Sequence, residues 1–374
     1  MPGKPAVRLT DTVAHPLPPI LMGGPGSLTV LICYLPAWRA VSPAAVAALQ
    51  SAQQTADTAI QIAENAAKAA SATPAGPGLR VAAEVTKGVA AAAMSATIAS
   101  AAAGSDMHIC LTPWPIPSHA IGVDIEGSPT VLVNGFRQAR QGDKLLEAIG
   151  GTGSITGGCP TVLVGAAGIV GNVPAGQAAC VAARAGRNPP PGAVDPNGNQ
   201  LQPNTAGQSY SNCGCETSRQ LINQATPLNI SQETLLNQAM AGGQATQVPG
   251  NLYQSGNTGP QARQQILQNN GVPSHLEDRT MGNLESSVAA GRGNIVVVDS
   301  QTLWTNGTTP ASTGDHVVVV TGVEYDDNGN VKNVIINDTG AGTCSQKVPL
   351  NVWNQATSPA IGPWQNNVTD NPIW

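Results

Sequence analysis

Aromatic and charged side chains are both scarce in this chain of 374 residues, where they make up 3% and 10% of the total. So few aromatic residues argue against a large aromatic core, and 42 glycines with 30 prolines favour turns and short strands over helix bundles. The shortage of charge and a formal net charge of -5 are unsuited to neutralising phosphates. We therefore expect no nucleic-acid partner.

Long apolar runs are missing as well. The opening MPGKPAVRLTDTVAHP has no apolar run of the length that a secretory signal needs. The best membrane candidate, residues 89–104, is shorter than the roughly 20 residues of a spanning helix and is mostly alanine. We expect export, if it occurs, to proceed without a signal peptide, and membrane contact only in transit.

The cysteines do not follow the pattern of a disulfide framework. There are seven, an odd number, and they are spread over a long chain. Cys213 and Cys215 lie two residues apart. Thiol or metal chemistry is therefore the expectation for this chain.

Three short segments repeat in the first half of the chain. Each predicts a turn followed by a β-branched strand: GSLTVLIC at 26–33, GSPTVLVN at 127–134 and GCPTVLVG at 158–165. The first two begin much farther apart than the last two, which indicates an insertion. The inserted residues 41–104 are rich in alanine and are interrupted by ATPAGPG, so they predict a helical hairpin.

The length of the chain favours two domains joined by a linker. Residues 184–208 have no periodicity and many helix and strand breakers, which is typical of an extended linker. We predict one domain at 1–40 and 105–165 around the insert, a linker at 166–207 and a second domain at 208–374.

The second domain reads as α+β, because helices come before strands along the chain. We expect helices at 213–225, 231–241 and 259–270, and then the strands NIVVVDSQ, HVVVVTGVEY and VKNVIIND.

The repeats resemble the PAAR-repeat family (proline-alanine-alanine-arginine), whose members sharpen the spike of bacterial type VI secretion machines. The matching residues are the three repeats themselves, with DMHIC before the second, LPAWRA after the first and GFRQARQGD after the second. The resemblance implies a small β cone with pseudo-threefold symmetry. It also implies a trimeric spike protein as a partner.

The same resemblance implies a structural zinc ion held near the apex of the cone. The candidate ligands are His15, His108, His119 and Cys159, with Cys110 as a substitute. The alternative is that these are surface histidines and small buried cysteines. The third repeat departs from the family, since Glu147 and Ala148 stand where His or Cys is common.

The second domain contains the groups that a cysteine peptidase needs. Cys213 follows Ser211 and Asn212, which are good N-cap residues, and the start of a helix favours a thiolate. His316 opens one apolar strand as the candidate base, and Asp338 ends the next. If those two strands are antiparallel neighbours, the carboxylate lies beside the imidazole.

Further groups complete this prediction, and two alternatives stay open. Gln208 is the candidate oxyanion donor, and Gly214 would leave room for a substrate backbone. Cys215 is a rival nucleophile, because positions two apart on a helix are about 200° apart and only one can face a cleft. His275 is a rival base. Any of these side chains could instead serve packing alone.

Residues 206–345 resemble the bacteriocin-leader (double-glycine) peptidases of the papain-like clan. The matches are Gln208 before NCG, GPQARQQILQNNGV, GRGNIVVVD, GDHVVVVTG and INDTG. Departures are Ser218 and Gln220, where the family is apolar, and a spacing of five residues between Gln208 and Cys213. The resemblance implies a papain-like fold, a Cys-His-Asp site and cleavage after Gly-Gly.

Together these features predict a multi-domain effector that a type VI machine delivers to competing bacteria, where it cuts a target-cell protein in the cytoplasm. A cognate immunity protein would be a further partner. Two other functions stay open: deamidation or peptidoglycan amide hydrolysis by the same fold, and a structural tip with an inactive binding domain. Wall hydrolases of this clan usually orient the catalytic histidine with a second histidine, whereas the candidate here is Asp338.

Overall fold

The computed structural model describes residues 3–14, 20–110, 120–148, 152–174, 176–185, 211–249 and 255–374. The chain divides into two compact units. The N-terminal unit comprises Met1–Ala167 and Asp327–Gly329, and the C-terminal unit comprises Gly168–Asp326 and Asn330–Trp374. Each unit combines helices with antiparallel strands, as the sequence predicted at this coarse level.

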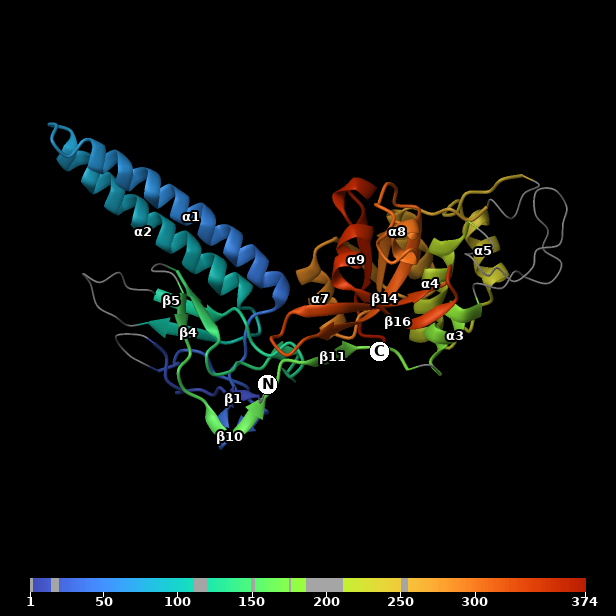
Figure 1. Cartoon of the computed structure of the whole chain (residues 1–374), viewed down its shortest axis with the longest axis horizontal. Coiled ribbons are helices and arrows are strands. Elements are labelled where there is room, and N and C mark those ends of the chain that lie inside the picture. Colours follow the sequence, from blue (N-terminus) through green and yellow to red (C-terminus); the bar gives the residue numbers. More distant parts are fainter. Residues whose placement is uncertain are drawn as a thin grey trace. The chain divides into compact units, whose positions relative to one another are not determined.

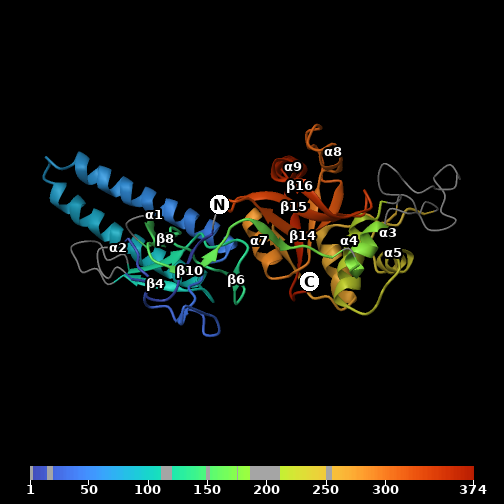
Figure 2. The ribbon, with the colours of Figure 1, turned by 60° about the horizontal axis from the view of Figure 1, so that its bottom comes forward.

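The boundary between the units lies earlier than the sequence indicated. Strand β11 (Gly168–Gly171) pairs antiparallel with the last residues of β14 (His316–Tyr325). Helix α3 (Ala178–Ala185) lies beside α4 (Cys213–Ala225), as Figures 1 and 2 show. The predicted linker at 166–207 therefore included two elements of the C-terminal unit. Their small, weakly periodic residues carried no strand or helix signal.

The N-terminal unit consists of short antiparallel strands. Three two-stranded pairs are β1 (Lys4–Ala6) with β10 (Cys159–Val164), β2 (Leu31–Ile32) with β3 (Leu35–Pro36), and β6 (Leu132–Val133) with β7 (Phe136–Arg137). A four-stranded sheet has the order β4 (Met107–Cys110), β5 (Ala120–Asp124), β8 (Lys144–Glu147), β9 (Thr152–Ser154).

The first two repeats form the same tight hairpin. Cys33 and Tyr34 connect β2 to β3 with φ of 48° and 68°, and Asn134 and Gly135 connect β6 to β7 with φ of 52° and 82°. Positive φ at both central residues is the geometry of a type I′ turn, which matches the twist of the flanking strands. The repeated letters therefore correspond to a repeated local structure.

A closed ring of backbone hydrogen bonds links three segments of the unit. The Val7 amide donates to the Ala139 carbonyl at 2.9 Å, Ala139 to Trp38 at 3.0 Å, and Trp38 to Val7 at 3.0 Å. Each of these three residues occupies the same place relative to the other two. The ring gives the centre of the unit pseudo-threefold symmetry.

An arginine follows each residue of the ring and pairs with an aspartate in the same way. Each arginine donates both its side chain and its backbone N–H to one carboxylate. The pairs are Arg8–Asp11 at 2.7 Å, Arg39–Asp106 at 2.9 Å and Arg140–Asp143 at 3.2 Å. In the second pair the alanine-rich insert lies between the arginine and the aspartate, whereas in the other two pairs they are three residues apart. The insert therefore lies within one of three equivalent segments.

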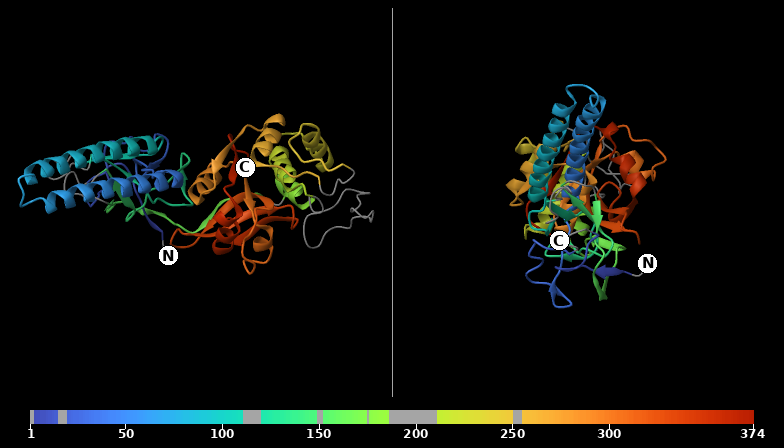
Figure 3. Two further views of the ribbon diagram at one scale, coloured as in Figure 1. Left: turned by 90° about the horizontal axis from the view of Figure 1, so that it is seen from above. Right: turned by 90° about the vertical axis from the view of Figure 1, so that its left-hand side faces the viewer.

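The insert forms two helices, α1 (Pro43–Ala69) and α2 (Gly76–Ala101), which lie side by side in Figures 1 and 3. Ser42 caps α1, since its hydroxyl accepts the Ala45 N–H. Leu49, Met94 and Ile98 bury the base of the hairpin against β5 and β8. Within the described part of the chain, α2 is the one helix long and apolar enough to cross a membrane, a test that helices of soluble proteins also pass.

Cysteine pairing departs from the sequence-based expectation. Cys33 forms a disulfide with Cys159, and Cys180 forms one with Cys344, while Cys213 is free. The partners are 126 and 164 residues apart in the sequence. Separations of that size depend on the fold, so the spacing of the cysteines could not predict them.

The Cys33–Cys159 bond completes a second ring in the N-terminal unit. At the start of the first repeat, Ser27 donates to Asn134 at 2.6 Å, and at the start of the second, Ser128 donates to the Gly165 carbonyl at 2.7 Å. Cys159 has the corresponding position in the third repeat. A covalent bond thus stands where the other two repeats have a hydrogen bond.

The C-terminal unit contains one sheet with antiparallel pairing throughout. Its order is β12 (Ser274–Asp278), β17 (Gln365–Thr369), β13 (Asn294–Val298), β14, β15 (Val331–Asp338) and β16 (Thr343–Pro349), and β11 pairs with the second half of β14. The strands β13 to β15 lie where the sequence predicted them. The apolar runs of β13 and β14 are buried on both faces, which explains their unbroken valines.

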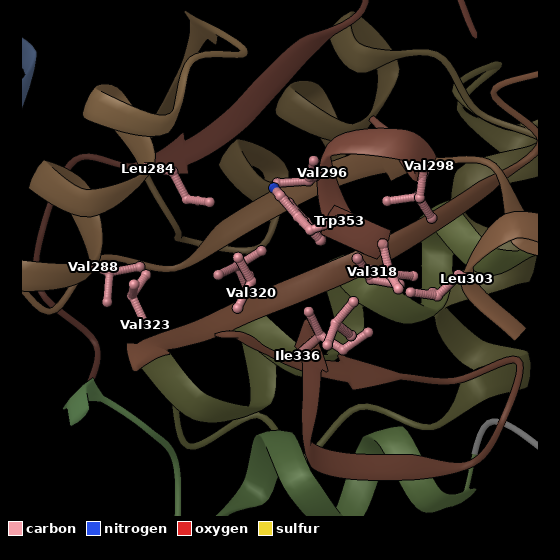
Figure 4. Close-up of a cluster of buried hydrophobic side chains, with 14 of the residues drawn as sticks. Leu284, Val288, Val296, Val298, Leu303, Val318, Val320, Val323, Ile336 and Trp353 are labelled. Atoms are coloured by element: carbon pink, nitrogen blue, oxygen red, sulfur yellow. The ribbon is translucent and has the colours of Figure 1, made fainter. Parts of the chain in front are cut away.

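Helices cover both faces of this sheet. One face packs against α4, α5 (Gln232–Ala241) and α6 (Pro260–Asn269), and the other against α7 (Met281–Ala289), α8 (Ser300–Trp304) and α9 (Leu350–Ala356). Because side chains alternate along a strand, Val317 and Val319 face α4, and Val318 and Val320 face α7 to α9. Figure 4 shows the hydrophobic cluster on the face that packs against α7 to α9, where Val318, Ile336 and Trp353 lie close together.

Candidate active site

Cys213 is the first residue of α4, as the sequence predicted. Its thiol is free and half-buried. The N-cap residue is Asn212, but its side chain makes no capping hydrogen bond, so the helix start is not held in the predicted way. Thr217, one turn later, donates its hydroxyl to the Cys213 carbonyl at 3.0 Å.

The segment 255–259 holds the first turn of α4. The Cys215 thiol donates to the Gly256 carbonyl at 3.7 Å. Gly256 has a φ of 108°, and a Cβ there would lie 2.7 Å from the Asn212 Cβ, so only glycine fits this close approach. A Cβ on Gly214 would collide with the Thr258 hydroxyl. Gly214 is therefore buried against this segment and does not open space for a substrate, contrary to the sequence-based expectation.

His316 and Asp338 form a buried pair. His316 begins β14 and Asp338 ends β15, and these strands are antiparallel neighbours, as expected. The imidazole Nε2 and the carboxylate Oδ1 are 2.7 Å apart. Antiparallel pairing brings the start of one strand beside the end of the next, which joins two residues 22 positions apart.

Three further groups hold the Asp338 carboxylate. The Trp304 indole N–H donates to Oδ2 at 2.8 Å, and the backbone N–H groups of Gly340 and Ala341 donate to Oδ1 at 2.8 and 3.2 Å. The Trp304 ring also tilts against the His316 ring, with centroids 5.3 Å apart and planes at 56°. The carboxylate and the imidazole are thereby fixed in one orientation.

Electrostatics favour an ion pair at this site. Burial lowers the pKa of His316, but the Asp338 charge and hydrogen bonds with Asp338 and Cys213 outweigh burial and raise that pKa to about 10. Burial raises the pKa of Asp338, but the His316 charge and the hydrogen bonds from His316 and Trp304 bring it below its ordinary value. Since Nε2 faces Asp338, Nδ1 is the ring nitrogen available to Cys213.

Cys215 has the environment of a structural cysteine. It is fully buried, and burial, with smaller contributions from Glu216 and Cys213, raises the pKa of its thiol to about 12. A thiol in that range stays protonated near neutral pH. These observations favour Cys213 over Cys215 as the nucleophile.

Of the remaining peptidase candidates, His275 is not brought to this site. His275 lies on β12, where its Nδ1 is 2.6 Å from the Asp370 Oδ1. Strands β17 and β13 separate β12 from β14, so His275 is an unsuitable base for Cys213. Gln208 lies outside the described residues.

Some of the predicted zinc ligands lie within the described residues and others lie outside them. His15 and His119 lie outside the described residues, as does the side chain of Cys110. His108 is fully buried on β4. Cys159 is bonded to Cys33, and a sulfur in a disulfide does not act as a thiolate ligand, so the ligand set as predicted does not fit. The described residues contain no group of three or more metal-binding side chains.

Sequence reasoning did not find that Trp304, Gly340 and Arg263 lie near the candidate residues Cys213, His316 and Asp338. Trp304 lies in a short helix between strands, and only the fold shows that its indole reaches Asp338. Gly340 belongs to the INDTG motif, whose letters do not show which side chains pack against the glycine. Arg263 lies on α6 within a stretch of glutamines and gave no signal.

Comparison of the chain with models of protein families, with curated proteins and with solved structures gave no match. The function is therefore argued from the geometry of the chain itself.

Proposed function

We propose that the C-terminal unit is a cysteine endopeptidase of the papain-like type. The observation that carries the proposal is the His316 ring, which interacts with Cys213 on one side and with Asp338 on the other. The catalytic groups of a cysteine peptidase are a thiol, an imidazole and a carboxylate that orients the imidazole, in that order. The buried ion pair supports the proposal, because a charged imidazole is the proton donor that the leaving amine requires.

In this mechanism the Cys213 thiolate attacks the scissile carbonyl and forms a tetrahedral intermediate. The His316 imidazolium then gives its proton to the leaving amine, and the carbon–nitrogen bond breaks to leave a thioester. Neutral His316 next takes a proton from water, whose oxygen attacks the thioester and releases the acid and the thiolate. Asp338 keeps Nε2 engaged throughout, so that Nδ1 stays directed at the reacting groups.

The first experiment measures growth of a sensitive bacterium that expresses the full-length chain. Cys213→Ala and His316→Ala should abolish toxicity, because the thiolate and the imidazole act as a unit. Cys215→Ala is the matched control and should keep most of it. Full toxicity of Cys213→Ala would rule out this nucleophile.

We also propose that cleavage follows two consecutive small residues, most simply Gly-Gly, in a flexible segment of a target-cell protein. This step rests on the resemblance to the double-glycine peptidases, and an extended glycine pair lets a carbonyl approach Cys213 without side-chain collision. New N-termini in cells that make the active chain, compared with Cys213→Ala, test it by mass spectrometry. Cleavage mainly after large residues would contradict it. Toxicity without new N-termini would favour deamidation or peptidoglycan amide hydrolysis instead.

For the N-terminal unit we propose a PAAR-like β cone that caps the trimeric spike of a type VI secretion machine. The pseudo-threefold rings support this proposal, because a monomer with threefold pseudosymmetry can match a trimer. The repeats also expose apolar side chains, including Leu28 at 86%, Leu31 at 61% and Tyr34 at 94%. Such side chains suit a protein interface. A cognate immunity protein in the producing cell belongs to the same proposal.

One structural zinc ion in this unit remains part of the proposal, with His108 as its described ligand and Cys159 withdrawn. A fully buried imidazole suits a structural metal, which would contribute to the folding free energy of the unit. Metal analysis of the purified full-length protein should find about one zinc, and His108→Ala should lose it. Wild-type protein that is folded and free of zinc would end this idea.

A further inference from the structure

Arg263 is a buried cation without a charged partner among the described residues. The side chain lies on α6 and is 1% exposed. Its Nε donates to the Asn367 side-chain oxygen at 3.0 Å and its Nη1 to the Thr258 carbonyl at 2.9 Å, and both acceptors are neutral. Its Nη2 is buried with no hydrogen-bond partner within the described ranges. Burying a cation in this way is costly unless an anion lies nearby.

The Arg263 side chain packs against the first turn of α4. A Cβ placed on Gly214 would lie 3.2 Å from the Arg263 Cδ, so the arginine side chain packs against the backbone between Cys213 and Cys215. Burial lowers the pKa of Arg263, whereas the sulfurs of Cys213 and Cys215 raise it, and the balance is about 10. The arginine thus stays charged near neutral pH.

The charged and titratable groups that the structure describes around the two cysteines leave one candidate anion. Asp338 is paired with His316 at 2.7 Å, and Glu216 is paired with Arg219 at 2.7 Å. With its pKa near 12, Cys215 is a neutral thiol. Among the described residues, Cys213 is the remaining group nearby that can carry a negative charge to balance Arg263.

We propose that Arg263 is a positioning residue of the peptidase, which balances the charge of the Cys213 thiolate and takes no part in proton transfer. This inference rests on the proposed function. His316 loses its positive charge when it protonates the leaving amine, whereas Arg263 keeps its charge through the whole cycle. The arginine therefore also stabilises the thiolate when it leaves the thioester.

The test measures alkylation of Cys213 by iodoacetamide as a function of pH in the full-length protein. Fragment mass spectra separate Cys213 from Cys215. Arg263→Met should raise the pH midpoint of alkylation by about one unit or more, the usual effect of an opposite charge within a few ångströms. Arg263→Lys should restore most of that change. An unchanged midpoint in folded Arg263→Met would overturn the proposal.

Two controls separate charge from structure. Asn367→Ala removes the acceptor of the Nε bond but leaves the charge, so it should lower Tm without moving the midpoint. If Arg263→Met does not fold, the alkylation midpoint of Cys213 is measured in His316→Ala instead. In that variant Arg263 is the cation that remains near Cys213. The midpoint should stay below that of a denatured Cys213 peptide, and a midpoint at or above the peptide value would overturn the proposal.

This readout does not depend on peptide cleavage. A protein that cleaves no substrate but shows the shift would refute the proposed function and leave only the charge pairing of Arg263 with Cys213. A protein that cleaves normally with Arg263→Met and shows no shift would refute only this inference.

Discussion

Gly340 is packed closely against three side chains of the candidate site. A Cβ there would lie 2.6 Å from the Trp304 ring, 3.0 Å from the His316 ring and 3.1 Å from the Asp338 carboxylate. Gly340→Ala should therefore displace Trp304 or His316 and lower the rate of substrate cleavage about tenfold or more, with a loss of about 1–3 kcal/mol of stability. Cleavage assays and thermal unfolding check both effects.

Gly176→Ala is the matched control, because nothing lies within 4 Å of a Cβ at that position in the same unit. It should leave the rate and Tm unchanged. Equal rates for Gly340→Ala and the wild type would show that the close packing around Asp338 does not matter for catalysis.

The His316–Asp338 pair also predicts how stability depends on pH. The pKa of His316 is raised from 6.5 to about 10, so its contribution is complete below pH 6.5 and is lost as the pH rises through 10. The pKa of Asp338 is lowered from 3.8, so its contribution is present above that value and is lost as the pH falls through the folded pKa. The pair therefore contributes most between about pH 4 and 6.5.

Urea unfolding of the wild type and Asp338→Asn, followed by tryptophan fluorescence, tests this dependence. Asp338→Asn should cost about 3–5 kcal/mol near pH 6, the usual effect of breaking a buried pair. The difference should shrink as the pH approaches 10. A difference that stays constant from pH 6 to 10 would show that His316 is neutral in the folded protein.

At the scale of elements, a disulfide and two hydrogen bonds attach α3 and the segment just before it to the rest of the C-terminal unit. The Cys180–Cys344 disulfide joins it to β16, with Cα atoms 5.3 Å apart. Arg219 of α4 donates to the Ala182 carbonyl at 2.9 Å, and Ser345 donates to the Val173 carbonyl at 2.9 Å. These bonds bring residues before the predicted domain start into the C-terminal unit.

Replacing both Cys180 and Cys344 by serine should lower the unfolding free energy of the C-terminal unit by about 2–4 kcal/mol under oxidising conditions. The loss should disappear when both proteins are unfolded in a reducing agent, because the wild type then lacks the bond as well. Replacing Cys33 and Cys159 is the control, since that bond belongs to the other unit. A loss that persists in reductant would assign the effect to packing.

At the scale of the whole molecule, the boundary of the C-terminal unit predicts which shortened chain can keep its activity. A chain that begins at residue 200 lacks β11 and α3, whereas one that begins at Gly168 keeps both. The longer version should retain toxicity and the shorter one should lose most of it. Equal toxicity would mean that β11 and α3 are dispensable for the fold.

The compartment of action is a second property of the whole molecule. We expect the full-length chain to arrest growth when it is made in the cytoplasm, because reducing conditions protect the Cys213 thiolate from oxidation. Expression with and without an added export signal tests this, with Cys213→Ala beside each. Growth arrest confined to the exported form would place the target in the periplasm.

The sequence by itself determined the parts of this protein whose signals are local. The repeats predicted strands, the alanine-rich insert predicted two helices, and the valine runs predicted β13 and β14. Cys213 at a helix start, His316 opening a strand and Asp338 ending the next were visible because each depends on neighbouring residues alone.

Tertiary structure decided everything that depends on contacts between distant segments. The burial of Cys215, the disulfides, the place of β11 and α3 in the C-terminal unit, and the groups that surround Asp338 all depend on residues far apart in the chain. Arg263 is the clearest case, because neither its burial nor its distance from any carboxylate can be read from the glutamines around it. Burial and charge pairing are properties of the packed molecule, and a single sequence carries them only through its fold.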